Sequence, residues 1–428
     1  MAGQERGGRL IDRSPMLAFG FLLAASTCVG QTYFIALFGG HIRADLGLSH
    51  GAFGGLYTLA TAVGALGLVW LGRAADRIGP VRLSLVTLAG LALAALLMAS
   101  AQSALVLGLA LFALRALGQG MLGHVMITAI TRWFQRRRGR ALSIAMLGFS
   151  AAEAALPVLV ALALGAMVWR QIWLIAAATL LLVVAPMIAV LGRLIADGGV
   201  PQAATGGARP AGGASSLVAT DQARPAWTRP QVLRDPRFYA LLPGLLAPPF
   251  IITGMLFHQV HLVESKGWVL AEFAALFPGY AIAATATSLG LGVLIDRFGS
   301  ARLLPFYLLP LLAGLGLLAF GSSLLAGGGF LALAGSAGGA AAILPSTLWA
   351  ELYGTTHLGA IRSVAMAATV LSTAAAPGLM GVLIDSGVAI EQQAAGLALY
   401  TAAVTLSLAL LRPRLKPTAP RAIVPAGA

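Results

Sequence analysis

Two charged residues lie inside long apolar segments, where their presence requires a chemical reason. Arg115 is the only Lys or Arg, and Glu153 the only acid, well inside such a segment. An ionised side chain at the middle of a membrane costs at least about 2.5–3.5 kcal/mol, so each should face a cavity or an opposite charge. At 1.5 Å per helical residue, Arg115 lies about 17 Å and Glu153 about 18 Å from the ends of their segments, so we expect similar depths.

This pair supports two interpretations. In the first, Glu153 takes up and releases a proton while Arg115 pairs with it or with an anionic substrate. Protonation then changes the relative energies of two access states. In the second, the two side chains form a static ion pair that locks their helices together.

Other polar residues in apolar segments are weaker candidates. Gln31 and Thr32 could hydrogen-bond a solute or a neighbouring helix. His124 and His258 could relay protons near neutral pH, or they could hydrogen-bond in the core or at the rim. His258 and His261 lack a nearby carboxylate partner, so they make a weak metal site. We therefore predict neither a metal ion nor a cofactor.

The elements that must hold these residues are membrane helices. The chain has 428 residues, of which 59% are hydrophobic and 10% charged, whereas soluble globular proteins have about 25% charged residues. A spanning helix needs about 20 apolar residues, and continuous apolar runs exclude the alternating pattern of a membrane barrel. The single cysteine, Cys28, excludes an internal disulfide. Twelve spans are predicted: Met16–Phe38, Phe53–Leu71, Leu83–Ala101, Ala104–Thr131, Ala141–Gly165, Ile172–Leu191, Phe238–Val260, Ala271–Ile295, Leu303–Phe320, Phe330–Ala350, Val364–Ile384 and Ala394–Leu411.

The basic residues indicate how these spans are oriented. With both termini in the cytoplasm, 24 of the 28 Lys and Arg residues fall on the cytoplasmic side, and only Arg43, Arg170 and Lys266 fall outside. This bias follows the positive-inside rule and predicts a multi-pass protein of the plasma (inner) membrane. The net charge of +14 then reflects membrane orientation. Nucleic-acid binding is not expected, because Arg136–Arg138 is only a short loop cluster.

A long polar stretch divides the chain into two halves. Residues 193–237 are rich in Gly, Ala and Pro, carry six arginines and show no apolar periodicity. The expected organisation is an N-terminal six-helix bundle (1–192), a flexible cytoplasmic linker (193–237), and a C-terminal six-helix bundle with a short cytoplasmic tail (238–428).

The two halves share a short pattern at a constant offset of 220 residues. Gly72, Asp76, Arg77 and Gly79 recur as Gly292, Asp296, Arg297 and Gly299. Gly139, Ser143 and Pro157 recur as Gly359, Ser363 and Pro377, while Arg140 and Arg362 match with a displacement of two residues. Two parallel, equivalent halves of this kind are typical of transporters whose substrate site lies between the halves near the bilayer midplane.

These stretches point to a known family. Gly72–Gly79 and Gly292–Gly299 resemble the loop signature of the major facilitator superfamily, and Arg115–Gly120 resembles that family's fourth-span motif. Pro80 and Ser300 depart from its usual basic run. The resemblance covers essentially the whole chain. It implies an all-α membrane protein with 12 transmembrane helices in two pseudo-symmetric six-helix bundles, which acts as a monomeric transporter by alternating access and is not an enzyme.

The loop signature has a physical interpretation of its own. Asp76 and Asp296 are carboxylates at the membrane edge, suited to meet the positive N-terminus of another helix. In the implied architecture these helices are the spans that begin near Arg362 and Arg140, respectively. We hypothesise two cross-bundle latches that close the cytoplasmic side. The alternative is that these are ordinary interfacial charges beside arginines.

We expect secondary active transport of a small organic solute, coupled to protons. The region Trp133–Ser143 is similar to the monocarboxylate and oxalate–formate branch, which favours an organic carboxylate. That branch places bases in spans 8 and 11, and here only Arg362 stands at the start of span 11, so a carboxylate would depend on Arg115. One alternative is efflux of amphipathic drug-like compounds, but the span-5 signature of the transporters that export them differs from Ser150–Pro157. The other alternative is a non-transporting receptor or channel.

Overall fold

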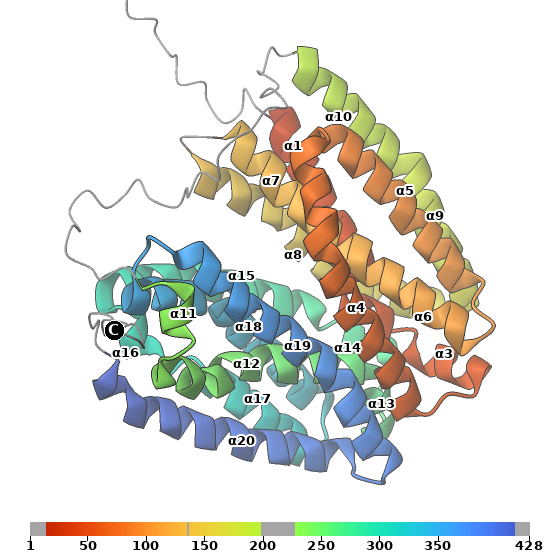
Figure 1. Cartoon of the computed structure of the whole chain (residues 1–428). Coiled ribbons are helices and arrows are strands. Elements are labelled where there is room, and N and C mark those ends of the chain that lie inside the picture. Colours follow the sequence, from red (N-terminus) through yellow and green to blue (C-terminus); the bar gives the residue numbers. More distant parts are fainter. Residues whose placement is uncertain (1–13, 135–136, 198–226, 416–428) are drawn as a thin grey trace, which may run out of the picture. The chain divides into compact units, whose positions relative to one another are not determined.

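The computed structural model describes residues 14–134, 137–197 and 227–415, with the side chains of residues 68–77 excepted. All the regular secondary structure in this part of the chain is helical (Figure 1). The first half contains α1 (Ser14–Ser26), η2 (Thr27–Gly30), α2 (Thr32–Ala36), α3 (Gly39–Leu46), α4 (His50–Arg77), α5 (Pro80–Ala99), α6 (Ala104–Ala113), η3 (Leu114–Leu122), α7 (Gly123–Trp133), α8 (Arg138–Leu164), α9 (Trp169–Thr179), η4 (Leu180–Val184) and α10 (Ala185–Asp197). The second half contains α11 (Arg229–Val232), α12 (Pro236–Phe257), α13 (Gln259–Ser265), α14 (Leu270–Ala274), α15 (Phe277–Phe298), α16 (Ser300–Leu303), α17 (Leu309–Phe320), α18 (Leu324–Tyr353), α19 (Leu358–Asp385), α20 (Ile390–Leu411) and η5 (Arg412–Arg414).

Nine helices of the described chain are long and apolar enough to cross a membrane. They correspond to nine of the twelve predicted spans. The predicted span Met16–Phe38 forms α1, η2 and α2, and Leu303–Phe320 contains the shorter apolar helix α17. The predicted span Phe53–Leu71 lies within α4, which is 28 residues long.

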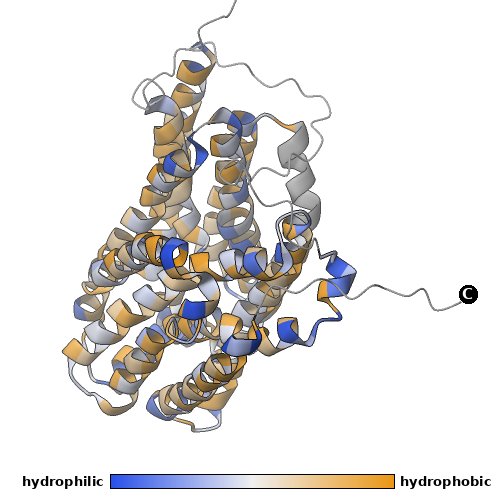
Figure 2. Ribbon diagram, turned by 90° about the vertical axis from the view of Figure 1, so that its left-hand side faces the viewer, coloured by the Kyte–Doolittle hydropathy of each residue, from blue (hydrophilic) through white to orange (hydrophobic). Residues whose placement is uncertain are grey.

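Apolar side chains cover the outside of these helices, as a lipid environment requires. Leu399, Leu406 and Leu410 lie seven and eleven residues apart on one face of α20 and are 74%, 62% and 69% exposed. Figure 2 shows apolar residues along the length of the helices. A soluble monomer rarely exposes a contiguous apolar face of this kind, because it would drive association.

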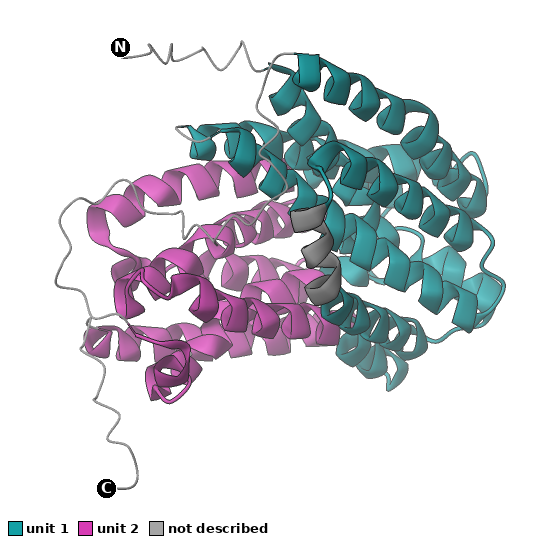
Figure 3. Cartoon of the chain, turned by 45° about the horizontal axis from the view of Figure 1, so that its top comes forward, with its two compact units in different colours: residues 1–206, 255–278, 377–387 teal, residues 207–254, 279–376, 388–428 magenta. Residues whose placement is uncertain are grey.

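The chain forms two compact units (Figure 3). Unit 1 contains residues 1–206, 255–278 and 377–387, and unit 2 contains residues 207–254, 279–376 and 388–428. Thus two short segments of the second half pack with the first half. Most of the predicted linker, residues 198–226, lies outside the described residues.

Small residues bring the helices of each unit together. A Cβ atom on Gly148 of α8 would lie 2.0 Å from the carbonyl oxygen of Phe21 in α1. In unit 2, Cβ atoms on Gly335 and Gly339 of α18 would lie 2.3 and 2.2 Å from carbonyl oxygens of α15. Only glycine allows backbones to approach so closely, as is common in membrane helix packing.

Residues 255–278 and 377–387 are connected to the first half by hydrogen bonds at the predicted outer ends of the spans, which is consistent with their place in unit 1. The Asp385 carboxylate accepts the backbone N–H groups of His50 and Gly51, at 3.0 and 2.8 Å, in the first turn of α4. The Gln259 side chain donates to the backbone carbonyl of Tyr33 at 2.7 Å. A carboxylate at a helix N-terminus satisfies free N–H groups and meets the positive end of the helix dipole.

Three histidine rings lie close together beside this cap. One of them belongs to His50, which precedes the apolar run of α4 by three residues. The His50 ring centroid lies 4.5 Å from that of His261 and 5.9 Å from that of His258. His258 Nε2 donates to the Pro377 carbonyl at 3.0 Å, because a carbonyl can only accept. Burial, aided by the charges of Arg43 and His261, lowers the pKa of His50 to about 4.

An aspartate also joins outer loops within unit 1. Asp45 accepts a hydrogen bond of 2.8 Å from the Trp169 indole and pairs with the Arg170 guanidinium. These two bonds lower the pKa of Asp45 below its usual value. Arg170 also donates to the Ala101 carbonyl at 3.0 Å. Arg170, one of the three predicted outer bases, therefore connects the segment that contains Asp45 with the end of the third predicted span.

The two copies of the loop signature differ in how they treat the backbone N–H at the start of the helix that follows. Gly299 precedes helix α16, and the N–H and hydroxyl of Ser300 donate to Glu351 Oε1 at 2.8 and 2.9 Å. At the equivalent place Gly79 precedes α5, and Pro80 is its first residue. Proline has no N–H to satisfy, and it suits the first position of a helix.

The two cytoplasmic latches remain predictions. Asp76, with Gly72 and Arg77, lies in the part of α4 whose side chains are not described. Asp296 is exposed at the end of α15, and it belongs to unit 2 whereas Arg140 belongs to unit 1.

Acidification should loosen the histidine cluster. Separated from the cluster, His50 takes up a proton near its ordinary pKa of 6.5, but in place it does so only near pH 4. The packed form is therefore favoured above about pH 6.5 and loses stability as the pH falls toward 4. The charged or titratable groups that act on His50 are Arg43, His258, His261 and Asp385.

Hydrogen–deuterium exchange in the first turn of α4, corrected for intrinsic rates, measures this effect. Protection should fall between about pH 7.5 and 5 in the natural chain. In the variant His50→Asn it should change much less. Equal protection at both pH values in the natural chain would contradict the prediction.

Replacing Glu351 should weaken unit 2. Glu351→Gln removes a charged acceptor from Ser300, and such hydrogen bonds contribute about 1.5–3 kcal/mol. We expect a lower thermal unfolding temperature in detergent, while Glu272→Gln, at an exposed position, serves as the control. The double variant Ser300→Pro, Glu351→Thr copies Pro80 and Thr131 of the first half and should recover part of the loss. An unchanged unfolding temperature for Glu351→Gln would show that the bonds contribute little.

Candidate functional site

Arg115 lies in a π-helical segment of the fourth predicted span. The segment, η3, joins α6 to α7, and Arg115 is 4% exposed. Its Nε donates to Thr61 Oγ1 at 3.2 Å, and its Nη1 donates to the Gly30 carbonyl at 3.0 Å and to Thr32 Oγ1 at 3.5 Å. Its guanidinium lies 5.1 Å from the centre of the Tyr57 ring. Single π-helical turns inside α-helices are frequent at functional sites.

A break in the first span provides one of these partners. The short 3₁₀ segment η2 ends at Gly30, and Gln31 has an extended backbone, so the Gly30 carbonyl lies outside a regular α-helical ladder. A Cβ atom on Gly30 would lie 2.3 Å from the Leu114 carbonyl, so only glycine permits this approach to η3. The break and the glycine together place a backbone acceptor beside Arg115.

The partners of Arg115 are neutral. Thr32 shares a hydrogen bond of 2.7 Å with the hydroxyl of Tyr57, which completes the group around the guanidinium. Arg115 therefore links α4 to the break in the first span through hydroxyl, carbonyl and aromatic groups. Glu153 is not among the partners that the described residues supply.

Glu153 is a buried carboxylate on α8 and is 8% exposed. None of the described residues forms a hydrogen bond or ion pair with its carboxylate. Cys28 is within electrostatic range of Glu153 and donates to the Phe149 carbonyl at 3.7 Å.

A proline lies one helical turn beyond Glu153. Pro157 stands inside α8, and it has no N–H for the carbonyl of Glu153. The main-chain oxygen of Glu153 thus lacks its regular i+4 donor, and its side chain has no hydrogen bond from the described residues. A buried carboxylate and a carbonyl that lack these partners within a membrane span mark a candidate functional site.

The other predicted residues lie elsewhere. Gln31 is half-buried and makes no side-chain hydrogen bond with the described residues, and His124 is exposed on α7. His258 belongs to the outer histidine cluster, where it is 4% exposed. Within the described chain, no group of three or more His, Cys, Asp or Glu residues has a metal-binding arrangement.

Sequence analysis named Thr32, which accepts a hydrogen bond from Arg115, but it missed the other residues that hold Arg115. Tyr57 and Thr61 are four residues apart, so they share one face of α4. A pair of hydroxyls at helical spacing in an apolar span was the available signal. The role of Gly30 depends on the backbone break, which no local pattern indicates.

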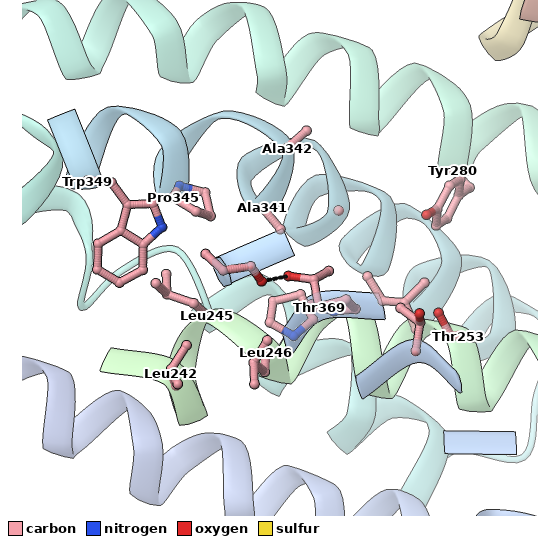
Figure 4. Close-up of a pocket in the computed structure, with 16 residues that line it drawn as sticks. Leu242, Leu245, Leu246, Thr253, Tyr280, Ala341, Ala342, Pro345, Trp349 and Thr369 are labelled. Carbon is pink, nitrogen blue, oxygen red and sulfur yellow. Dashed lines mark hydrogen bonds between the residues drawn. The ribbon is translucent and has the colours of Figure 1, made fainter. Parts of the chain in front are cut away.

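Unit 2 contains a cavity of about 300 Å³ (Figure 4). It is lined by sixteen residues of α12, α15, α18 and α19, and none of them is charged. Its polar side chains are Thr253, Tyr280, Trp349, Thr369 and Thr373. The rest of the lining is apolar.

The cavity corresponds to the surroundings of Glu153 in the first half. At the offset of 220 residues, Thr373 is the counterpart of Glu153, and the lining residues Pro248 and Thr369 are the counterparts of Cys28 and Phe149. The proton candidate and the cavity thus occupy equivalent positions of the two repeats.

Comparison with known proteins agrees with the duplicated helical fold. Residues 20–377 match the family model described as Major Facilitator Superfamily. The structure resembles a bacterial homologue of the human lysosomal transporter Spinster, solved inward-facing and unoccupied, with a TM-score of 0.70 and 15% identity over 95% of this chain and 98% of that one. It also resembles the nucleoside transporter NupG, with a TM-score of 0.67 and 12% identity over 94% of this chain and 98% of that one. No match is found among curated proteins.

The structural likenesses establish the fold, and the family match covers most of the chain. They confirm the predicted all-α membrane fold, in which the nine clear apolar spans belong to an architecture of twelve. The chain belongs to the major facilitator superfamily and is a multi-pass membrane protein with the fold of that family's secondary transporters.

Proposed function

We propose that this protein moves a small organic solute across the membrane by alternating access and couples the movement to a proton bound at Glu153. The observation that carries the proposal is the burial of this carboxylate without a hydrogen bond or ion pair from the described residues. An ionised carboxylate without a partner is costly at membrane depth, whereas a protonated one is far less so. Proton binding can therefore change which access state is favoured.

Arg115 has a separate role in this proposal. Its hydrogen bonds to Thr61 and Gly30 hold the break in the first span against α4. A static pair with Glu153 is less well supported, because every described partner of Arg115 is neutral. Arg115 is thus a positioning residue that keeps the first repeat assembled around the proton site.

The uncharged cavity of unit 2 bears on the choice of solute. A carboxylate substrate would find no base among its lining residues. The same observation favours a second candidate function, efflux of amphipathic compounds. In both cases Glu153 supplies the coupling, and the direction of transport follows from which access state releases the proton.

We also propose an inner-membrane location with both termini in the cytoplasm, and a monomer as the transporting unit. The support for the orientation is the distribution of the basic residues, 24 of 28 on one side.

Replacing Glu153 tests the coupling. Glu153→Gln keeps the size of the side chain but cannot titrate. We expect folded protein that exchanges solute across proteoliposome membranes but no longer accumulates it in response to a pH gradient. The control is Glu272→Gln, at an exposed position.

Two results would argue against a proton at Glu153. One is accumulation by Glu153→Gln that still follows the pH gradient. The other is a variant that fails to fold, which is the outcome expected for a static pair.

Replacing Arg115 should give a different result. Lysine carries all its donors on one nitrogen, so Arg115→Lys cannot donate to Thr61 from one nitrogen and to the Gly30 carbonyl from another. The loss of a buried charged hydrogen bond should lower the free energy of unfolding by about 1.5–3 kcal/mol. Thermal unfolding measures this loss, and the folded fraction should keep its response to a pH gradient. A stable variant that no longer responds to the gradient would assign Arg115 to coupling instead.

A further inference from the structure

We infer that the cavity of unit 2 binds a neutral aromatic solute that carries an amide or a similar donor–acceptor group. This inference rests on the proposed transport function and names the substrate class that it would serve. It depends on three properties of the cavity: the absence of charge among its lining residues, a free indole N–H, and carbonyl groups next to prolines.

The first property is charge. The sixteen lining residues include no Asp, Glu, Lys, Arg or His. A charged solute that enters such a cavity loses its hydration without gaining an opposite charge there. A neutral solute loses much less, so the lining selects against both anions and cations.

The second property is a hydrogen-bond donor. Trp349 is 1% exposed, and its indole N–H has no hydrogen-bond partner among the described residues. Figure 4 shows the indole nitrogen on the side of the ring that faces the other lining residues. The ring packs against Phe238 and Tyr353, with centroid distances of 5.2 and 5.9 Å, which fixes its orientation. The N–H edge of a rigidly held indole thus faces the cavity, where it can donate a hydrogen bond to a carbonyl group of a solute.

The third property is a set of acceptors. Pro345 lines the cavity inside α18 and has no N–H for the carbonyl of Ala341, which also lines it. Pro249 has the same relation to Leu245 in α12. The Thr253 hydroxyl, without a hydrogen bond from the described residues, adds a group that can donate and accept. A solute with an N–H group can use these oxygens, whereas a carboxylate has no donor for them.

The size of the cavity limits the solute. About 300 Å³ is at the lower end of the range for small-molecule sites. It is large enough for a one- or two-ring compound surrounded by the leucine, proline and alanine side chains of the lining.

Three ligands that differ mainly in charge test the inference. The full-length protein is purified in detergent and tested by equilibrium dialysis at neutral pH with 2-naphthamide, 2-naphthoate and 2-naphthylmethylammonium. We expect 2-naphthamide to bind at least about tenfold more tightly than either ion. Equal or tighter binding of an ion, or no binding of 2-naphthamide, would overturn the inference.

Matched variants locate the site. Trp349→Phe keeps an aromatic ring but removes the N–H, and it should weaken 2-naphthamide binding about 3- to 10-fold, as expected for one hydrogen bond. Trp173→Phe, at a buried position in contact with Phe34 and Phe38 of unit 1, should leave affinity unchanged. If Trp349→Phe does not fold, Thr253→Val gives the same test with a smaller change of shape. Equal affinity in the folded cavity variant and the control would overturn the assignment.

The experiment separates this inference from the proposed function. Binding is measured at equilibrium without a gradient, so it reports on the cavity and does not depend on gradient-driven accumulation. Selective binding together with transport that ignores protons would reject only the coupling. Coupled transport of a carboxylate with weak amide binding would reject only the substrate class.

Discussion

The structure depends on one constraint: a polar group in hydrocarbon has no water to bind, so the protein itself must satisfy it. Arg115 is the clearest case, because a buried guanidinium is held by two threonine hydroxyls, a backbone carbonyl and the Tyr57 ring. The carbonyl is available only because the first span breaks at Gly30. The break in that span therefore supplies a hydrogen-bond acceptor for the buried guanidinium. Glu153 departs from this rule, since the described residues leave its carboxylate unpaired, and that departure is the basis of the proposed proton site.

The duplicated halves meet the same constraint with different residues. Where α5 begins, Pro80 removes the N–H that would need a partner; where α16 begins, Ser300 keeps it and Glu351 accepts it. In both cases the first residue of the helix leaves no backbone N–H without a partner, so proline in one half can stand where serine stands in the other. One turn before the shared prolines, the halves differ in another way, with Glu153 in the first and Thr373 in the second. A difference at this depth changes the chemistry of the site, because it gives one repeat a carboxylate well inside a span where the other has a hydroxyl.

This division of labour gives the two repeats distinct proposed tasks. The first repeat holds the titratable group and the buried base that stabilises its surroundings. The second holds an uncharged cavity whose donors and acceptors suit a neutral solute. Coupling between proton and solute then needs no direct ion pair between them, since each changes the energy of the same access states. The outer cluster of His50, His258 and His261 is a separate element that we predict to loosen in acid, and it lies beside the Asp385 cap at the first turn of α4.

The sequence by itself determined the membrane helices, the duplication and the family, because hydropathy, the constant offset and the loop signature are properties of short stretches that persist in any fold of the chain. It also singled out Arg115 and Glu153, since a charge in an apolar run is visible without coordinates. Only the tertiary structure decided what these residues contact. The carbonyl of Gly30 is 85 residues from Arg115, and Asp385 caps a helix that begins 335 residues earlier. Such partners depend on where the helices pack and where they break, and no local pattern encodes the distance between two spans. For the same reason the free N–H of Trp349 could be recognised only once its neighbours were in place.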